Sequence, residues 1–330
     1  MALNLTPDYL DADRKYRQAS SPAEKLAALE EMLRTIPKHK ASEKKQAEIK
    51  RRISELRQTR QTAKKGGGPD PFHIPPQGAG QLLLFGPPNS GKSSIVGALT
   101  KAPVKITEFP YGTPLPVPGM AHHEDVPIEL VDLPPVTPDH LPAGMINTLR
   151  NTDLIAVTVD LAADSVLEDV EAMLAVLAER DIVLDDKASD GGGDADVLDV
   201  GPQGFIVCTK GDLPAADDNF ETLEELRPAA PAMIRVSAET GTGLDVMLRT
   251  AFEMLRVIRV YAKEPGKPAD KDRPFILPVG STIEDLARTI HKDLAAKLKF
   301  ARVWGETGHA GAQVHGHHVL HDRDAVELHA

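Results

Sequence analysis

The chain has 330 residues, of which 41% are hydrophobic and 26% charged, and its formal net charge is −11. These values are typical of a globular protein with two or three domains of about 150 residues each. No apolar run approaches the ~18 residues that a membrane helix needs, and no basic segment precedes an apolar core near Met1, so we expect neither a membrane partner nor a signal peptide. The single cysteine, Cys208, excludes an internal disulfide, and we expect a cytoplasmic protein.

Positive charge is concentrated in residues 38–65, which hold eleven Lys or Arg against three Glu, a local net charge of +8. Because the whole chain carries −11, the remainder carries −19. A basic segment on an acidic body is typical of a contact with a polyanion. It is equally expected of a solvated helix face, and composition leaves both interpretations open.

The first predicted elements are two amphipathic helices. Residues 22–36 have apolar side chains at helical spacing, with Ser21 as the N-cap. A second helix over about 42–62 carries Lys and Arg on most positions outside its apolar stripe. We expect a basic helical hairpin within residues 1–66, which still needs a partner for its apolar stripes, and a Gly/Pro linker over 67–80.

From residue 81 to 256, strand and helix patterns alternate, which predicts an α/β domain with a mostly parallel sheet and helices on both faces. Strands are expected at 81–85, 127–132, 153–160, 204–208 and 232–236, and helices at 92–100, 165–180 and 243–257. An acidic, glycine-containing stretch near 185–202 is expected to form a mobile loop.

After residue 257 the pattern changes to that of a small β-rich domain. We expect strands at 257–262, 274–278, 300–304, 318–320 and 325–329, and a helix at 282–298.

The sequence GPPNSGKSS at residues 86–94 follows the first strand of the α/β domain and opens its first helix. It matches G-x-x-x-x-G-K-S without a mismatch, in the strand–loop–helix context that a phosphate-binding loop requires. The glycines let successive N–H groups point at a phosphate, and the helix N-terminus adds partial positive charge. Lys92 is expected to reach the β- and γ-phosphates, and the Ser93 hydroxyl to bind Mg²⁺.

Three further strand ends favour guanine over adenine. Asp132 ends the strand 127–132, where a carboxylate can hold Mg²⁺ through water and where ligands of open α/β sheets gather. Asp212 follows the strand 204–208 and can accept both N–H donors of guanine, while Lys210 can lie over the base. Backbone N–H groups in 237–243 can bond guanine O6. This order favours a GTP site, and Asp212 disfavours an ATPase or kinase.

These motifs resemble those of the Obg-HflX superfamily of GTPases, and most closely the developmentally regulated GTP-binding proteins. The matching stretches are KHKASE at 38–43, PIELVDLP at 127–134, ILPVGSTIEDL at 276–286, IHKDL at 290–294 and FARVWG at 300–305. The resemblance implies a P-loop GTPase domain over 81–256, preceded by the helical hairpin. It also implies a C-terminal TGS domain, a ubiquitin-like β-grasp, over 257–330.

The resemblance implies a GTPase that binds GTP and GDP with Mg²⁺ and acts on the ribosome or another RNA particle, through residues 38–65 and the TGS domain. Lys92 is the residue it implies for catalysis. The implied nucleotide-binding residues are Asn89, Ser90, Gly91, Lys92, Ser93, Ser94, Thr209, Lys210, Asp212, Ser237, Ala238 and Glu239. The implied metal ligands are Ser93, Thr113 and Asp132.

The sequence departs from the family in both switch segments. The first switch is assigned to 109–114, FPYGTP, where Thr113 would supply the second hydroxyl to Mg²⁺. Pro135 stands where the family has a glycine whose N–H bonds the γ-phosphate, and proline has no N–H. Val136, four residues after Asp132, cannot orient water as a Gln does. We expect slow hydrolysis of GTP; the alternative is a GDP/GTP-sensing scaffold with negligible hydrolysis.

Asn89 has two interpretations. In resembling GTPases that use potassium, an Asn at this position helps to hold K⁺; alternatively, Asn89 bonds only its own loop. The histidines at 315, 317, 318 and 321 lack a companion Cys, so a solvated hairpin is favoured over a metal site. Trp304 is expected in the core of the β-grasp domain.

Overall fold

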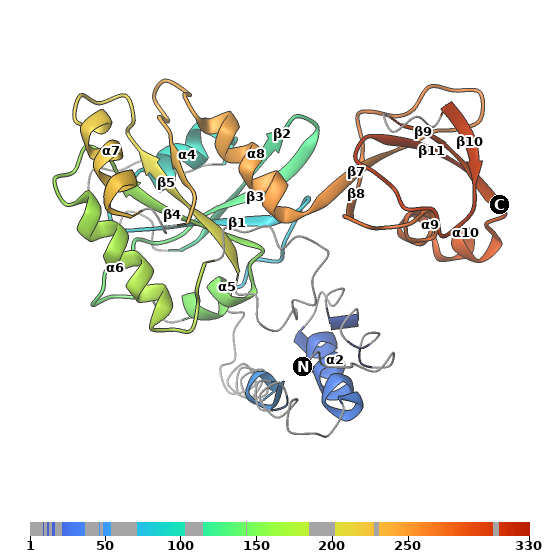
Figure 1. Cartoon of the computed structure of the whole chain (residues 1–330), viewed down its shortest axis with the longest axis horizontal. Helices are drawn as coiled ribbons and strands as arrows, with labels where there is room; N and C mark the ends of the chain where they lie inside the picture. Colours follow the sequence, from blue (N-terminus) through green and yellow to red (C-terminus); the bar gives the residue numbers. More distant parts are fainter. Residues whose placement is uncertain are drawn as a thin grey trace. The chain divides into compact units, whose positions relative to one another are not determined.

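A computed structural model of the chain describes residues 22–36, 71–102, 115–142, 144–184, 202–227, 231–305 and 310–330, together with residues 9, 12, 15, 16, 46 and 49–53. The chain divides into two compact units (Figure 1). One comprises residues 1–70 and 189–201, and the other residues 71–188 and 202–330.

The first unit contains the helix α2 (Pro22–Thr35), as the apolar spacing predicted. Its buried cluster also includes residues from outside this helix: Tyr9, Ala12, Leu29, Met32, Ile36, Ile49 and Ile53. Tyr9 and Ala12 are themselves helical and supply the partner that the two predicted stripes lacked. Most of the helix predicted over 42–62, and most of the basic segment, lies outside the described residues.

The second unit begins with a six-stranded sheet in the order β2-β3-β1-β4-β5-β6. Its strands are β1 (Gln81–Phe85), β2 (Val117–His123), β3 (Val126–Asp132), β4 (Leu154–Asp160), β5 (Gln203–Thr209) and β6 (Met233–Arg235). Every neighbouring pair is parallel except β2 and β3, which form an antiparallel hairpin. The predicted mostly parallel sheet is confirmed.

Helices cover both faces of this sheet, as predicted (Figure 1). They are α4 (Lys92–Leu99), α5 (Met145–Asn151), α6 (Val166–Ala178), α7 (Ala216–Leu226) and α8 (Leu244–Leu255). Leu83 and Phe85 of β1 face a core with α5, α6 and α7, whereas Leu82 and Leu84 face α4 and α8. This alternation is the period-2 geometry of a strand that is buried on both sides.

The strand β2 was not predicted, because its sequence VPGMAHH contains a proline and a glycine. Proline is tolerated at the edge of a sheet, where one side of the strand has no ladder partner, and β2 is an edge strand. The helices α5 and α7 were not assigned individually either. The acidic loop predicted near 185–202 lies outside the described residues apart from Pro202.

The second sheet has five strands in the order β10-β9-β11-β7-β8. They are β7 (Val257–Ala262), β8 (Phe275–Pro278), β9 (Phe300–Trp304), β10 (Ala310–Val314) and β11 (Asp324–His329). The two helices of this domain are α9 (Ile283–Ile290) and α10 (Lys292–Lys297). A capping box between Thr282 and Asp285 begins α9. The parallel pairing of β7 with β11 and the helices on one face give the predicted β-grasp.

Three predictions in this domain were wrong. The helix over 282–298 is two helices, because His291 is extended and its Nδ1 accepts from the Asp293 N–H, capping the second helix. The strand at 318–320 is only an isolated bridge between Thr282 and Val319. Trp304 is half-buried on the opposite sheet face from the core residues Ala301 and Val303, since side chains alternate along β9.

Among the helices of the described part of the chain, none is both long and apolar enough to cross a membrane.

Candidate functional site

The loop between β1 and α4 has left-handed backbone conformations, and a close contact within it requires glycine. Asn89 and Gly91 adopt left-handed φ angles of 61° and 85°. A Cβ on Gly86 would lie 2.2 Å from the Thr158 carbonyl oxygen, so only glycine fits there. The helix α4 begins immediately after Gly91 and has no side-chain N-cap, so its first N–H groups face the loop. This is the shape that the phosphate-loop prediction required.

Lys92 lies inside this loop and is only 6% exposed. Its ammonium donates to the carbonyls of Gly86 (2.9 Å) and Pro87 (2.7 Å) and to the Ser90 hydroxyl (3.2 Å). Burial lowers the pKa of Lys92 to about 8, and the Asp132 carboxylate partly opposes this shift. The ammonium is therefore positioned within the loop where a phosphate would be held.

Two hydroxyls that sequence patterns had not assigned to this role hold the loop against the sheet. The Thr158 hydroxyl of β4 lies 3.1 Å from the Ser90 hydroxyl, and both are buried. The Thr209 hydroxyl of β5 lies 2.9 Å from the Ser90 carbonyl and 3.0 Å from the Val159 carbonyl, to which it donates. Thr209 is a predicted nucleotide-binding residue, and in this structure its hydroxyl bonds protein carbonyls. In the sequence, the feature that could have pointed to Thr158 is its position as the one hydroxyl residue within the apolar residues 154–159.

Ser93 and Asp132 meet at the carboxyl end of β3, as predicted. The Ser93 hydroxyl donates to an Asp132 carboxylate oxygen over 2.6 Å. Hydroxyl and carboxylate oxygens suit Mg²⁺, which usually binds one or two protein oxygens together with phosphates and water. The residues therefore fit this metal. The third predicted ligand, Thr113, lies outside the described residues.

No group of three or more His, Cys, Asp or Glu side chains suited to a metal ion occurs in the part of the chain that the structure describes.

The predicted base-binding residues lie at the ends of the neighbouring strands β5 and β6, and Asp160, which was not predicted, ends the adjacent strand β4. Lys210 has a left-handed φ of 55°, and its ammonium pairs with Asp160 at 2.5 Å. Asp212 is exposed, and a hydrogen bond with Ser237 holds the pKa of its carboxyl below the usual range. The carboxylate is thus kept ionised and able to accept two N–H donors of a base.

The loop after β6 is folded tightly around Ser237, which is 1% exposed. Its backbone N–H donates to the Thr242 carbonyl over 2.9 Å, and its hydroxyl accepts from the Thr240 N–H over 3.1 Å. Arg235 joins this loop to the preceding one through the Gly211 carbonyl, 2.9 Å from its Nε. Ala238 and Glu239 form the rim of the same turn, with Glu239 exposed.

The segment after Asp132 is buried rather than open. Pro134, Pro135 and Val136 are all buried, and the Val136 side chain packs in the core under α5 and α6. The Val136 N–H donates to the Gly86 carbonyl over 3.1 Å. The segment is thus attached to the phosphate loop by a hydrogen bond.

Of the predicted nucleotide residues, Ser94 lies in the first turn of α4 and is half-buried, without a described side-chain hydrogen bond. The loop and the three strand ends thus bring the glycine-bounded turn, the Ser93–Asp132 pair and the Asp212 carboxylate to the carboxyl edge of one sheet, where ligands of open α/β sheets gather.

Two family models match the chain: one described as a 50S ribosome-binding GTPase over residues 81–185, and the TGS domain over residues 258–330. An uncharacterized GTP-binding protein of Methanocaldococcus jannaschii is 25% identical over 92% of both chains. Developmentally-regulated G-protein 2 of Arabidopsis thaliana is 25% identical over 92% of this chain and 90% of its own. A solved GTP-binding protein of Pyrococcus horikoshii covers 76% of this chain and 99% of its own, at 16% identity and a TM-score of 0.48.

The chain is thus a P-loop GTP-binding protein that carries a C-terminal TGS domain. Its similar relatives include developmentally regulated GTP-binding proteins, at 24–25% identity. The resemblance described from the sequence motifs is confirmed, and proteins with this GTPase domain in general hydrolyse GTP.

Gly86→Ala is expected to lower the affinity for GDP on the order of 100-fold, because the added Cβ must displace the Thr158 carbonyl and with it the phosphate loop. Titration with a fluorescent GDP analogue measures the change. The control is Gly97→Ala, at an exposed position of α4, where alanine favours the helix by up to about 1 kcal/mol. Equal affinities in the two variants would contradict the role given to Gly86.

Asp212→Asn is expected to shift the preference from guanine to xanthine nucleotides by roughly 10- to 100-fold, since one charged hydrogen bond is worth about 1.5–3 kcal/mol. Competition between GDP and xanthosine diphosphate measures this preference. Asp218→Asn, an exposed change in α7, is the matched control. If Asp212→Asn kept the wild-type preference, the base would not be read by this carboxylate.

Proposed function

We propose that the protein hydrolyses GTP to GDP and phosphate at a low intrinsic rate and acts on the ribosome or another RNA particle. The burial of Val136 is the observation that supports a low intrinsic rate of hydrolysis. The residue four positions after Asp132 packs in the hydrophobic core and has no group that can orient water. Hydrolysis would rest on Lys92 and charge neutralisation at the phosphates, without a side-chain base.

Mg²⁺, when bound, would neutralise charge on the β- and γ-phosphates. Ser93 and Asp132 are the described residues that would hold it, and their oxygens already lie 2.6 Å apart. Thr113 stays a proposed third ligand. Lys92 would hold the phosphates, and the hydroxyls of Thr158 and Thr209 would keep the loop in shape around them.

Asn89 supports a proposed role for K⁺. Its left-handed φ of 61° is uncommon for a residue with a side chain, and such conformations gather at ligand sites. An Asn at this point of the loop could place its amide oxygen near the phosphates. A monovalent cation held there would add positive charge to that of Lys92, Mg²⁺ and the N-terminus of α4.

A second candidate function, a scaffold that senses GDP and GTP without hydrolysing, is favoured by Pro135. Proline has no N–H to offer a γ-phosphate, and the next N–H, on Val136, donates to the Gly86 carbonyl instead. This segment therefore offers the γ-phosphate no backbone donor in the described arrangement.

Phosphate release from GTP with Mg²⁺, measured in KCl and in NaCl, separates these two functions. We expect turnover below about 10⁻² s⁻¹ that rises in KCl and loses this rise in Asn89→Ala. Turnover in neither salt, with tight binding of both nucleotides, would reject the GTPase in favour of the scaffold.

Pro135→Gly tests whether the missing N–H of Pro135 weakens binding of the γ-phosphate. A new N–H donor to a charged phosphate is worth about 1.5–3 kcal/mol. We expect the variant to bind a non-hydrolysable GTP analogue roughly 10-fold more tightly relative to GDP than the wild type. Pro138→Gly, at an exposed position of the same segment, is the control.

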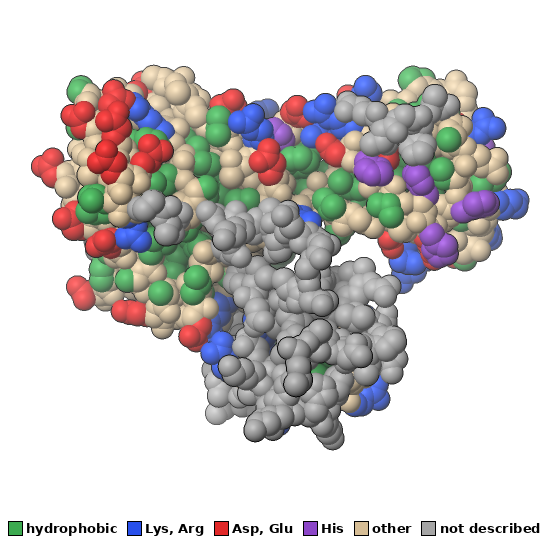
Figure 2. All heavy atoms as spheres, in the orientation of Figure 1, with side chains coloured by type: hydrophobic (Ala, Val, Ile, Leu, Met, Phe, Trp, Pro, Cys, Tyr) green, Lys and Arg blue, Asp and Glu red, His purple; other side chains and the backbone are tan. Residues whose placement is uncertain are grey.

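The proposed RNA contact rests on the distribution of charge. Figure 2 shows acidic side chains gathered over α7, where exposed Asp217, Asp218, Glu221, Glu224 and Glu225 would repel a polyanion. In the first unit, Lys50 and Arg51 are exposed while Ile49 and Ile53 of the same helix are buried. The basic segment 38–65 and the TGS domain are thus the proposed contacts, and a cytoplasmic location follows from such a partner.

Replacing Lys44, Lys45, Arg51 and Arg52 by Glu is expected to lower co-sedimentation with ribosomes at moderate salt by at least about 10-fold, because phosphate contacts dominate such binding. The affinity of the same variant for ribosomes should fall less steeply as the salt concentration rises. Arg249→Glu, at an exposed position of α8, is the control. Unchanged co-sedimentation of the quadruple variant would remove the RNA role from this segment.

A further inference from the structure

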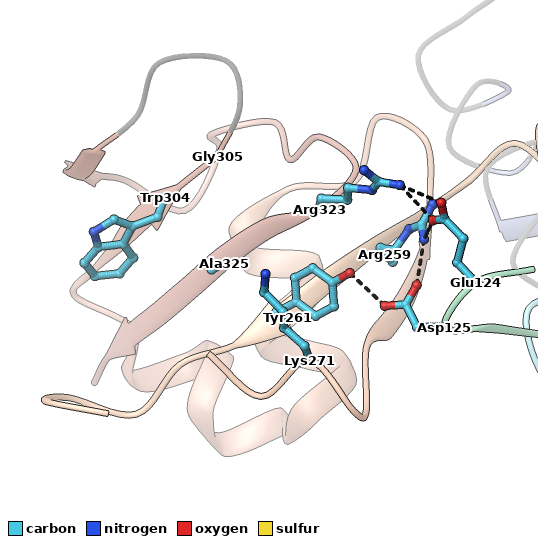
Figure 3. Close-up of a pocket in the computed structure, with 9 residues that line it drawn as sticks. All are labelled: Glu124, Asp125, Arg259, Tyr261, Lys271, Trp304, Gly305, Arg323 and Ala325. Carbon is cyan, nitrogen blue, oxygen red and sulfur yellow. Dashed lines mark hydrogen bonds and ion pairs between the residues drawn. The ribbon is translucent and has the colours of Figure 1, made fainter. Parts of the chain in front are cut away.

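The turn between β2 and β3 is joined to the TGS domain by charged side chains that range from buried to exposed (Figure 3). The turn carries Glu124 and Asp125, and β7 carries Arg259 and Tyr261. One Arg259 nitrogen lies 2.5 Å from Glu124 and 2.6 Å from Asp125. The Tyr261 hydroxyl donates to the other Asp125 oxygen over 2.7 Å. Two adjacent carboxylates of the GTPase domain thus contact one strand of the TGS domain.

The segment before β11 completes this junction. Asp322 accepts from the Nε of Arg259 over 3.0 Å, and Arg323 donates to both oxygens of Glu124, over 2.7 and 3.0 Å. Figure 3 shows Arg259 and Arg323 converging on Glu124 from the two TGS segments. Arg259 is only 3% exposed, so these carboxylates stabilise a positive charge that would be costly to bury alone.

The junction extends into the apolar packing of the GTPase domain. The guanidinium of Arg259 lies over the ring of Phe252 in α8, 5.0 Å from its centroid. The ring of His123, the last residue of β2, lies against the same Phe252 ring, with the two centroids 5.2 Å apart. Ile276 of β8 packs against the core formed by α4 and α8. Charge and apolar contacts therefore hold the hairpin, α8 and β7 together.

Backbone conformations single out this junction and the nucleotide loops. Six non-glycine residues in the described part of the chain have positive φ angles. Asn89 and Lys210 lie in the nucleotide loops, and Glu124 (54°), Arg256 (51°) and Arg323 (68°) lie where the two domains meet. Such conformations cost about 1–3 kcal/mol each and gather where a site or a switch requires them.

The same hairpin reaches the nucleotide site at its other end. Residues 117–123 of β2 pair without interruption with residues 126–132 of β3, from Val117 opposite Asp132 to His123 opposite Val126. At about 3.4 Å per residue, this two-stranded unit spans roughly 20 Å. Asp132, at one end, binds the Ser93 hydroxyl, and Glu124 and Asp125 form the turn at the other. The ladder therefore connects the end of the hairpin at the nucleotide site with its end at the TGS domain.

The junction also has room to rearrange. A cavity of about 500 Å³ lies beside Arg259, Tyr261 and Arg323 and extends to Lys271 and Trp304 (Figure 3). Close-packed side chains could exchange partners only by disrupting their neighbours. Here the arginines and the tyrosine can move into open space.

We propose that the β2–β3 hairpin couples guanine-nucleotide binding to the docking of the TGS domain through the Glu124/Asp125 contacts with Arg259, Tyr261 and Arg323. The proposal rests on the proposed GTPase function. A nucleotide that moves Asp132 and the hairpin favours or disfavours the docked TGS domain, and by linkage the docked domain changes the relative affinity for GDP and GTP by the same factor.

The test uses variants of exposed partners, because a change of the buried Arg259 could unfold the TGS domain. Glu124→Gln/Arg323→Gln removes two charges whose side chains are 50% and 44% exposed. Glu284→Gln/Arg288→Gln is the matched control, a 3.1 Å pair of the same residue types on α9. The full-length proteins are titrated with GDP and a non-hydrolysable GTP analogue. Amide hydrogen exchange is then followed in residues 257–262 with each nucleotide.

We expect the junction variant to change the ratio of the two affinities by at least about 5-fold relative to wild type. Exchange in 257–262 should differ between the two nucleotides in the wild type and the control, and lose that difference in the junction variant.

If the wild type binds both nucleotides but all three proteins share the same affinity ratio and exchange pattern, the coupling is overturned and the nucleotide site stands. If the wild type binds no guanine nucleotide, the proposed function is wrong, and the coupling that rests on it is overturned as well.

Discussion

The backbone shape of the loop between β1 and α4 is the constraint on which the rest of the nucleotide site depends. Asn89 and Gly91 adopt left-handed conformations, and the close approach of Thr158 to Gly86 leaves no space for a side chain. Such a backbone is costly for the chain to adopt. The hydroxyls of Thr158 and Thr209 hold it from two neighbouring strands, so the sheet provides the rigidity that the loop lacks.

The same sheet limits how the protein can respond to the γ-phosphate. Residues 133–136 continue from β3 into the core instead of leaving the surface as a free loop, because Leu133 and Val136 are both apolar and fully buried. The Val136 N–H is bonded to the Gly86 carbonyl. Any movement of this segment would expose apolar surface, at about 25 cal/mol for each Å². Within the described residues, the β2–β3 hairpin is therefore the part from which a larger response is expected.

β3 connects the two features on which function would depend. Its carboxyl end presents Asp132 to Ser93, and its first residue follows the turn that contacts the TGS domain. The carboxylates of that turn stay ionised, because hydrogen bonds from Arg259 and Arg323 lower the pKa of Glu124. Burial of Asp125 opposes ionisation, but hydrogen bonds from Tyr261 and Arg259 outweigh it and lower its pKa. Nucleotide site and domain contact thus share one rigid element.

The sequence by itself determined the phosphate loop and the strand ends around it, because these depend on local spacing, glycine positions and apolar periodicity. It also predicted a small β-rich domain after residue 257, whose β-grasp fold was implied only by the family resemblance of its motifs. It could not give β2, whose proline and glycine are acceptable only at a sheet edge. Nor could it place Thr158 against Ser90, Trp304 outside the core, or Arg259 against Asp125, residues 134 positions apart. Such contacts depend on the order of the strands and on which face of each strand a neighbour covers, and only the tertiary structure decides both.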